Sequence, residues 1–316
     1  MSNMQDALAL CVPYGKPNSQ YETWFEPATG TLWGYFNPRD TVCFSLALLK
    51  DIGAHEGPLA MNCGQIEIDG QMHKVNNYVV GSRTPHVFNM GGDLALFALL
   101  IKTREREAIA RYAKLCIDNM HRRLENYSSQ TLVSISLVQG DALGGGFEAA
   151  LTSDIIVAEE SAQMGFPEIL FNLFPGMGAY SLLARRIGMR AAEELILSGK
   201  ILPAAELHRM GIVDVLATDG QGEIAVRNWI ERNARRRNGL QGVLRARQII
   251  QPVTRAELDG IVELWVDAAL RLGERDLKMM NRLSRAQMRR LESSHAQNAV
   301  HPSEIAPEVE TLAAAS

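Results

Sequence analysis

Three consecutive glycines separate an apolar run from a helix-like segment in Val138-Gln-Gly-Asp-Ala-Leu-Gly-Gly-Gly-Phe-Glu148. The apolar run, residues 132–138, is short and rich in β-branched side chains, which is typical of a buried parallel strand. Glycines at such a turn let the backbone approach a ligand closely, and a helix that begins there directs unused N–H groups toward it. The pattern therefore predicts either a tight strand-to-helix crossover or a backbone site for developing negative charge, and the residues alone leave both open.

A second glycine pair, Gly91-Gly92, also stands between a strand-like and a helix-like run. N–H groups from two such turns could hold one oxyanion together. Glu148 directly follows the triple glycine, and Glu168 comes twenty residues later, after another strand-like run. Paired carboxylates can act as general acid and general base at adjacent carbons. Helix capping explains each glutamate equally well, because acidic residues are common in a first helical turn.

Strand-like and helix-like segments alternate over the first two thirds of the chain. Residues 25–36 predict a hairpin, residues 43–52 a helix, and residues 93–124 a helical stretch with a break near Lys102. Buried strands are predicted at residues 78–81, 132–138 and 155–158. From Gly188 onward the pattern is almost entirely helical and ends in one long helix over residues 255–291. The fold class is therefore α/β with a helical C-terminal region.

We divide the chain into a core over residues 1–215, a helical region over residues 216–291 and a flexible tail over residues 292–316. The tail mixes Ser, Ala, Glu and Pro without periodicity. An insert near residues 56–77 interrupts the core, and inside it residues 66–75 predict a hairpin with its turn at Asp69-Gly70.

Composition excludes several classes of protein. The 316 residues are 47% hydrophobic and 22% charged, as in a folded globular protein. The 32 Lys and Arg against 36 Asp and Glu give a net charge of −4, which argues against a nucleic-acid partner. The four dispersed cysteines predict free thiols in a reducing compartment. The N-terminal residues lack a basic signal-peptide region, and no apolar stretch is long enough to span a membrane, so we expect a cytoplasmic protein without a membrane partner.

Motifs for several kinds of chemistry are missing from the sequence. It contains no G-x-G-x-x-G dinucleotide fingerprint, no G-x-S-x-G nucleophile elbow and no H-E-x-x-H metal helix. The seven histidines are scattered and predict surface or capping roles. We therefore expect neither a metal nor another cofactor.

An ordered set of segments between Val80 and about Leu216 resembles the crotonase (enoyl-CoA hydratase) superfamily. The matching pieces are Phe88-Asn-Met-Gly-Gly-Asp93, the stretch from Val138 to Glu148, Phe166-Pro-Glu168 and Leu173-Phe-Pro-Gly-Met-Gly178. The resemblance implies a ββα spiral core. It also implies that the N–H groups of Gly92 and Gly145 form an oxyanion hole and that Glu148 and Glu168 are the catalytic pair.

Within that superfamily the chain is similar to bacterial diffusible signal factor synthases, over about residues 37–290. The likeness rests on residues 87–97, 147–151, 173–181 and 264–267. The resemblance implies synthesis of a cis-2-unsaturated fatty acid signal for quorum sensing from a 3-hydroxyacyl thioester on acyl carrier protein. Dehydration would come first, with Glu168 taking the C2 proton and Glu148 protonating the departing hydroxyl. Thioester hydrolysis would follow in the same site.

The synthase resemblance also implies an acyl pocket lined by Met177, Trp265 and Leu283. Trp265 and Leu283 are eighteen residues apart, which is about five turns, so a single long helix would place them on one face. Ordinary core packing is the alternative for each residue. The superfamily further implies a homotrimer or a hexamer, and the synthase likeness leaves room for a cognate sensor protein as a partner.

Positive charge gathers near the C-terminus. Residues 231–291 contain fourteen Lys or Arg and seven Asp or Glu, an excess of seven in a chain of net charge −4. Six basic residues recur at intervals of three or four along the predicted helix: Arg271, Arg275, Lys278, Arg282, Arg285 and Arg289. Such a stripe would attract an acidic carrier protein. It would also attract the negatively charged coenzyme A, and an ordinary solvated helix face explains the pattern equally.

Two other functions stay open at this stage. One is a degradative enoyl-CoA hydratase or 3-hydroxyacyl-CoA dehydratase that uses the same carboxylates and releases an intact thioester. The other is a non-catalytic regulatory protein that binds acyl thioesters. Two glutamates and two glycine turns argue against the second, because a binder has no need of a paired acid and base.

Overall fold

A mixed sheet of seven strands forms the centre of the computed structural model, which describes residues 11–300 and their side chains through residue 290. Its strands lie in the order β1 (Val12–Tyr14), β2 (Tyr21–Glu26), β3 (Thr31–Phe36), β6 (Asn77–Ser82), β8 (Val133–Val138), β10 (Ile155–Glu159) and β13 (Val215–Ala217). The strands from β3 to β13 pair in parallel, whereas β1, β2 and β3 are antiparallel neighbours. The predicted α/β class is confirmed.

A second, smaller sheet carries the turns that the sequence singled out. Its order is β12 (Ile201–Pro203), β11 (Gln163–Gly165), β9 (Asp141–Leu143) and β7 (Val87–Asn89). The chain passes three times from a strand of the large sheet to a strand of the small one and then into a helix. Because β7, β9 and β11 run parallel, their carboxyl ends meet at one edge.

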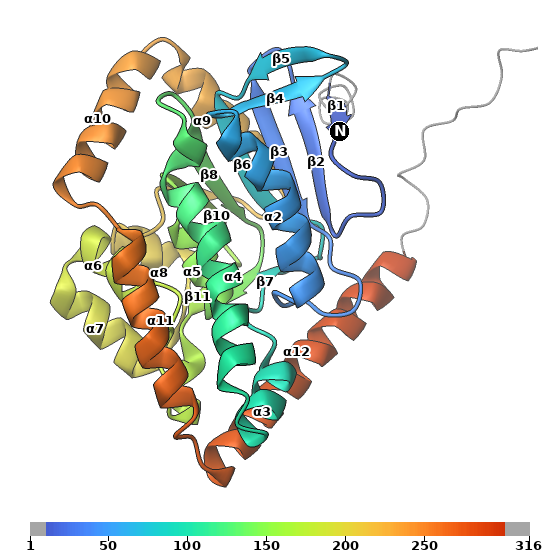
Figure 1. Ribbon diagram of the computed structural model, residues 1–316. Coiled ribbons are helices and arrows are strands. Elements are labelled where there is room, and N and C mark those ends of the chain that lie inside the picture. The colour runs from blue at the N-terminus through green and yellow to red at the C-terminus, as the bar shows by residue number, and fades with distance from the viewer. Residues whose placement is uncertain (1–10, 301–316) are drawn as a thin grey trace, which may run out of the picture.

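Helices cover both faces of the large sheet (Figure 1). The helices of the described residues, in chain order, are α2 (Leu46–Met61), α3 (Leu94–Lys102), α4 (Arg106–Leu124), η1 (Asn126–Ser128), α5 (Gly145–Leu151), η2 (Pro167–Phe171), α6 (Ala179–Ile187), α7 (Met189–Ser198), α8 (Ala204–Arg209), α9 (Gly222–Ala234), α10 (Arg237–Ile250), α11 (Arg255–Ala269) and α12 (Glu274–Val300). Tyr78 and Val80 of β6 face the main core cluster together with residues of α2 and α4, whereas Val79 between them joins a second cluster with Val226 of α9. This alternation is what two covered faces require.

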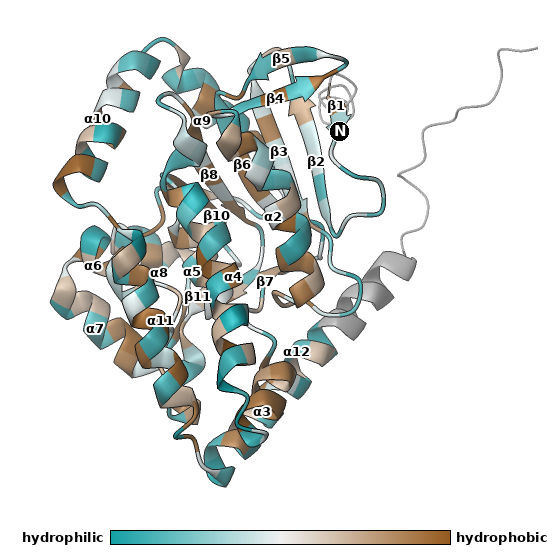
Figure 2. Cartoon of the chain, viewed as in Figure 1, coloured by the Kyte–Doolittle hydropathy of each residue, from teal (hydrophilic) through white to brown (hydrophobic). Residues whose placement is uncertain are grey.

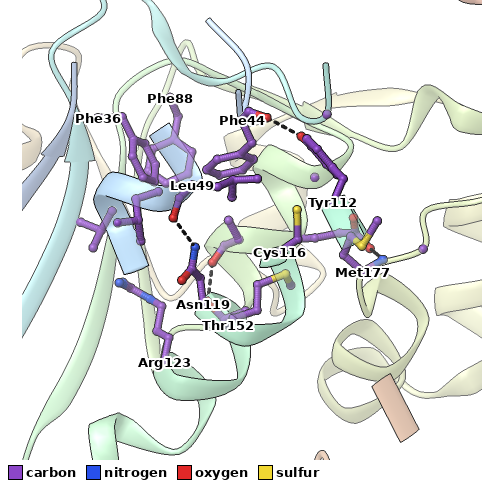
Figure 3. A pocket seen from close by; sticks show the side chains of 18 of the residues that line it. Phe36, Phe44, Leu49, Phe88, Tyr112, Cys116, Asn119, Arg123, Thr152 and Met177 are labelled. Carbon is purple, nitrogen blue, oxygen red and sulfur yellow. Dashed lines mark hydrogen bonds between the residues drawn. The ribbon is translucent and has the colours of Figure 1, made fainter. Parts of the chain in front are cut away.

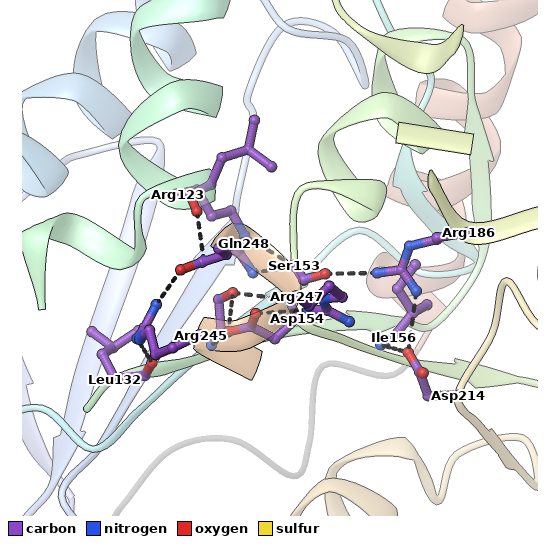
Figure 4. A network of polar contacts seen from close by, with 12 residues as sticks. Arg123, Leu132, Ser153, Asp154, Ile156, Arg186, Asp214, Arg245, Arg247 and Gln248 are labelled. Atoms are coloured by element: carbon purple, nitrogen blue, oxygen red, sulfur yellow. Dashed lines mark hydrogen bonds and ion pairs between the residues drawn. The ribbon is translucent and has the colours of Figure 1, made fainter. Parts of the chain in front are cut away.

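Polar contacts more than apolar ones attach α10 to the core. Leu244 is its buried residue, and Figure 2 shows a mostly hydrophilic helix with hydrophobic residues at its C-terminal end. Arg247 pairs with the buried Asp154 at 2.9 Å, and Arg245 donates to the Leu132 carbonyl at 3.0 Å (Figure 4). The arginines thus satisfy polar groups at the ends of β8 and β10.

Both predicted hairpins are confirmed. β2 and β3 pair as antiparallel strands, and so do β4 (Gln65–Ile68) and β5 (Gln71–Lys74). Asp69 and Gly70 have φ angles of 51° and 76°, the left-handed conformation that a two-residue hairpin turn of this kind needs. The helix predicted over residues 43–52 is longer than expected, because α2 continues past Gly53 and Pro58 to Met61 and takes in the first part of the predicted insert.

The prediction of one helix over residues 255–291 is wrong. α11 ends at Ala269 and α12 begins at Glu274. The N–H of Gly273 donates to Asp276 Oδ2 at 3.0 Å, which caps the new helix instead of continuing the old one. After this break α12 runs back beside α3 (Figure 1) and reaches Val300, so it includes residues 292–300 of the predicted tail. The rest of that tail, residues 301–316, lies outside the described residues.

Candidate active site

The turns after β7, β9 and β11 line one cavity. Gly92 follows the first of these strands, Gly145 and Glu148 follow the second, and Glu168 follows the third. Parallel pairing brings these turns to the same edge of the small sheet. Four residues that the sequence places up to 76 positions apart (Gly92 to Glu168) therefore converge on a single space.

Glu148 lies in the first turn of α5 and is 1% exposed. Its Oε1 accepts hydrogen bonds from the backbone N–H groups of Met177 at 2.8 Å and Ala179 at 3.0 Å. Burial raises the pKa of this carboxyl to about 7, although the two hydrogen bonds favour the ionised form and oppose the rise. Glu148 is thus held in one orientation and titrates near neutral pH.

Glu168 enters the cavity from η2, just after Pro167. Its Oε2 is buried and has no hydrogen-bond partner among the described residues. Burial, and then the negative charge of Glu148, raise the pKa of Glu168 to about 8. Gly144 has a φ of +51°, and a Cβ at that position would collide with Glu168 Oε1, so only glycine leaves room for this carboxylate.

The N–H groups of Gly92 and Gly145 are not used by any hydrogen bond found between described residues. A Cβ built on Gly145 would stand 3.5 Å from the Gly92 nitrogen, so the two backbone segments lie against each other. The turn is fixed from two directions, because the Gly91 carbonyl accepts from the Phe44 N–H at 2.8 Å and the Gly91 N–H donates to Asn89 Oδ1 at 2.8 Å. Two fixed and unused donors in one cavity are what an oxyanion hole requires.

Helix α12 supports the same turn, which the sequence did not indicate. Gln287 is 7% exposed, and its Nε2 donates to the carbonyls of Met90 at 2.9 Å and Gly92 at 3.3 Å. Three residues along, Arg290 pairs with Asp141 Oδ2 at 2.6 Å, at the start of β9. Helix α12 therefore fixes both the Gly92 turn and the start of β9 through its side chains. A glutamine in an arginine-rich helix gives no sequence signal for this role.

The structure brings together two of the three residues predicted for the acyl pocket. Met177 and Trp265 line the cavity, and the Trp265 ring packs edge-on against Phe97 at 5.2 Å. Leu283 is not among the lining residues and packs against the main core from α12. The break before Glu274 removes the shared helical face on which the argument for Leu283 rested.

Other lining residues come from segments in which the sequence indicates a strand, a helix or a glycine turn and no pocket. Figure 3 shows aromatic and apolar side chains from β3, α2, β7 and α4 along this cavity. They include Phe36, Phe44, Leu49, Phe88, Tyr112 and Cys116. An alternating or helical apolar pattern fits a cavity wall and a packed core equally well, so no local signal separates the two.

Residues 11–290 contain no cluster of three or more His, Cys, Asp or Glu side chains suited to a metal ion. In the same part of the chain, no helix combines the length and the apolar character that a membrane crossing needs. Cys11, Cys43, Cys63 and Cys116 form no disulfide.

Residues 69–246 match the family model described as enoyl-CoA hydratase/isomerase. The chain belongs to this family. It is 31% identical to human mitochondrial methylglutaconyl-CoA hydratase over 159 residues, which is 50% of this chain and 44% of that protein. It is 34% identical to the fatty acid oxidation complex subunit alpha of Pseudomonas savastanoi over 154 residues, 49% of this chain and 21% of that protein. The chain thus spans less than half the length of these curated relatives.

Solved structures share the crotonase fold. DspI of Pseudomonas aeruginosa has a TM-score of 0.60 and 25% identity, with 80% of this chain and 97% of that chain covered. An enoyl-CoA hydratase from Geobacillus kaustophilus has a TM-score of 0.64 and 16% identity, with 88% and 97% covered. The expected superfamily and its fold are confirmed.

Replacement of Glu168 by glutamine is expected to stabilise the protein at neutral and alkaline pH. A carboxyl with a raised pKa binds its proton more tightly in the folded state, so stability falls as pH rises from about 4.5 to about 8. Glutamine does not titrate. The melting temperature of Glu168→Gln at pH 8 should exceed that of the wild type by roughly 2 °C or more. The difference should vanish near pH 4.5.

Thermal unfolding followed by circular dichroism across this pH range measures the effect. Glu160→Gln is the matched control, because Glu160 is exposed and its replacement removes a carboxyl without removing a buried one. Parallel curves for wild type and Glu168→Gln would show that the carboxyl of Glu168 is not desolvated.

Proposed function

We propose that this protein makes a cis-2-unsaturated fatty acid signal by dehydrating a 3-hydroxyacyl thioester and then hydrolysing the thioester. One observation carries the proposal: the buried carboxylate of Glu148 and the carboxylate of Glu168, whose Oε2 is buried, share a cavity with the unused N–H groups of Gly92 and Gly145. Family membership supports acyl-thioester chemistry in general. The synthase resemblance of residues 37–290 supports the particular product.

Dehydration needs a base, an acid and a place for the negative charge. The base removes the C2 proton, and the electron pair moves onto the thioester oxygen, which Gly92 and Gly145 stabilise with their N–H groups. The enolate then re-forms the carbonyl, a C2–C3 double bond appears, and the 3-hydroxyl leaves as water after protonation by the acid. By analogy with hydratases, Glu168 is the base and Glu148 is the acid.

The raised pKa values of the two carboxyls suit acid–base chemistry, and they do not assign the two roles. With values of about 7 and about 8, the two carboxyls together hold close to one proton in the range between them. One group can then give a proton while the other accepts one. The hydratase analogy requires the shared proton to be on Glu148 when substrate is bound.

Hydrolysis can use the same groups. A carboxylate orients a water molecule toward C1 and takes its proton, while the oxyanion hole stabilises the tetrahedral intermediate. The carbon–sulfur bond breaks, the carrier thiol leaves with a proton, and the products are a free unsaturated acid and the free carrier. The free acid distinguishes this function from that of a degradative hydratase, which releases an intact thioester.

A degradative hydratase or dehydratase is the second candidate. The curated relatives named above favour it, because one of them is a hydratase and another is a subunit of a fatty acid oxidation complex. The same site would then catalyse only the reversible first step.

Glu148→Gln and Glu168→Gln should each lower production of the unsaturated free acid by roughly 10²- to 10⁴-fold, because each removes an acid or base from the reaction. Mass spectrometry of acids released from a mixture of 3-hydroxyacyl-carrier substrates measures the product. Glu160→Gln, at an exposed position, serves as the control. Unsaturated product that stays on its carrier would favour the degradative function, and near-normal turnover by either glutamine variant would remove that residue from the mechanism.

We further propose that the thioester arrives on acyl carrier protein. Five of the six residues in the basic stripe lie on α12, Arg271 lies just before it, and all six side chains are exposed. The buried residues Met280, Ser284 and Gln287 occupy the other side of the helix. The stripe therefore faces outward from the helix that holds the Gly92 turn, where an acidic carrier could bring its thioester to the site.

The double variant Arg275→Glu/Arg282→Glu should lower kcat/KM for a 3-hydroxyacyl carrier protein by about tenfold or more at low salt, and less at moderate salt. The matched coenzyme A thioester should be affected less. Arg190→Glu/Arg209→Glu, on α7 and α8, changes the net charge equally and should have little effect. Equal efficiency with both substrates, or an unchanged kcat/KM, would overturn the carrier assignment.

We also propose a trimer or a pair of trimers, as the superfamily resemblance implies. Large apolar side chains on α10 support contact with another copy, because Val243, Ile249 and Ile250 are 69%, 80% and 76% exposed. Light scattering at micromolar concentration should give a multiple of 34.9 kDa, and Val243→Glu/Ile250→Glu should shift the distribution toward that mass. A wild-type monomer would contradict this proposal.

A further inference from the structure

Helices α2 and α4 lie alongside the cavity in a fixed register. Three hydrogen bonds connect the α2 segment with α4 and the turn after it. They join Tyr112 to the Phe44 carbonyl, Asn119 to the Leu49 carbonyl at 3.0 Å, and Tyr127 to Glu56 Oε1 at 2.9 Å. The cavity between these helices therefore extends from the Gly92 turn to Glu56.

The wall of the cavity changes in character along this direction. On α4 the lining residues are Tyr112, Cys116, Asn119, Met120 and then Arg123. The side-chain amide of Asn119 already donates to the Leu49 carbonyl and accepts from Arg122. Cys116 is close enough to feel the charge of Glu148, and Arg123 stands seven residues further, or about 10 Å along the helix axis. On α2 the lining likewise passes from Leu49 and Ile52 to Glu56. A mostly apolar passage thus ends at two charged side chains.

Arg123 is 6% exposed and only partly satisfied. Its Nε and Nη2 donate to Ser153 Oγ, and Nη2 also donates to the Ile135 carbonyl at 2.8 Å (Figure 4). Figure 3 places the same side chain among those around the cavity. None of the hydrogen bonds between described residues is donated by Nη1, which leaves two N–H groups of a buried cation without an acceptor.

Glu56 is the second charged residue at this end of the cavity. It is 3% exposed, and its Oε1 accepts from the Tyr127 hydroxyl. Within residues 11–290 no ion pair of 4.0 Å or less joins Glu56 to Arg123, although the two charges influence each other. A donor and an acceptor thus line the same cavity, and no ion pair of 4.0 Å or less between these described residues closes the gap between them.

A group that fills this gap must both accept and donate a hydrogen bond. A methyl group that reached it would remove water from Arg123 and give no acceptor in return, which is strongly unfavourable for a buried cation. A carboxylate could accept from Arg123, but the negative charge of Glu56 would repel it. A hydroxyl can accept from Nη1 and donate to the Glu56 carboxylate, so it matches both neighbours.

We propose that Arg123 and Glu56 form a subsite for a hydroxyl group at the far end of the acyl chain. The substrate class is then an acyl thioester with an oxygen at its distal end, or a methyl-terminated chain short enough to stop before the subsite. The inference rests on the proposed function only in taking the ligand to be an acyl chain.

Wild-type protein provides the first test and needs no turnover. Isothermal calorimetry compares matched pairs of free fatty acids, one ending in a methyl and one in a hydroxyl, over a series of chain lengths. Short chains should bind better with the methyl end, because their hydroxyl would lie in the apolar passage. At the length that reaches Arg123, the hydroxyl-ended acid should bind about tenfold or more tightly than its partner.

Variants then assign the preference to these side chains. Arg123→Met should abolish the hydroxyl preference at that length, whereas Met120→Leu, which alters the apolar wall alone, should keep it. If Arg123→Met does not fold, Glu56→Gln tests the acceptor, because glutamine can still accept from Tyr127 and carries no charge. It should reduce the preference severalfold.

Methyl-ended acids that bind as tightly as hydroxyl-ended acids at every length would overturn the subsite, and so would a preference that survives Arg123→Met. The same pairs, prepared as 3-hydroxyacyl thioesters, separate this inference from the proposed function. A hydroxyl preference in binding without release of any unsaturated acid would support the subsite and refute the synthase.

Discussion

Parallel pairing of β7, β9 and β11 is the constraint on which the site depends. Each strand is only three residues long, and each leads directly into a turn that carries a functional group. Because the strands run in the same direction, the carboxyl ends bring Gly92, Gly145 and Glu168 together, and Glu148 follows within the first turn of α5. The large sheet supports this arrangement, since β6, β8 and β10 are themselves parallel neighbours and deliver the chain in the same order.

Burial of two carboxyls in one cavity works against stability and in favour of chemistry. Desolvation raises both pKa values into the neutral range, where a proton can pass between protein and substrate with little penalty. The fold offsets part of the unfavourable burial through the two N–H groups that Glu148 accepts from. It leaves Glu168 Oε2 without a partner, and such an unsatisfied atom at the centre of a cavity is available for a ligand.

Local sequence patterns were sufficient for most elements and for selecting the two glycine turns and the two glutamates as candidates. Glycine turns, alternating apolar residues and the Asp69-Gly70 hairpin act over a few positions, and a reader of the sequence can detect them. The resemblance then joined Gly92, Gly145, Glu148 and Glu168 into one hypothesis. The predictions that were wrong or missing depended on contacts between segments far apart in the sequence. The break before Glu274 turns α12 back across the core, which places Gln287 on the Gly92 turn and keeps Leu283 away from the cavity wall. The apolar periodicity within a single segment does not indicate that the chain turns back at this point.

The central claim is that Glu148 and Glu168 share close to one proton between about pH 7 and pH 8, as the proposed acid–base pair requires. Carbon-13 NMR of protein labelled at the glutamate carboxyls measures this directly, with the Glu148→Gln and Glu168→Gln spectra giving the assignments. The account predicts two carboxyl resonances that titrate near pH 7 and pH 8, far above the others. Titration of both near pH 4.5, the ordinary value of a glutamate, would contradict it.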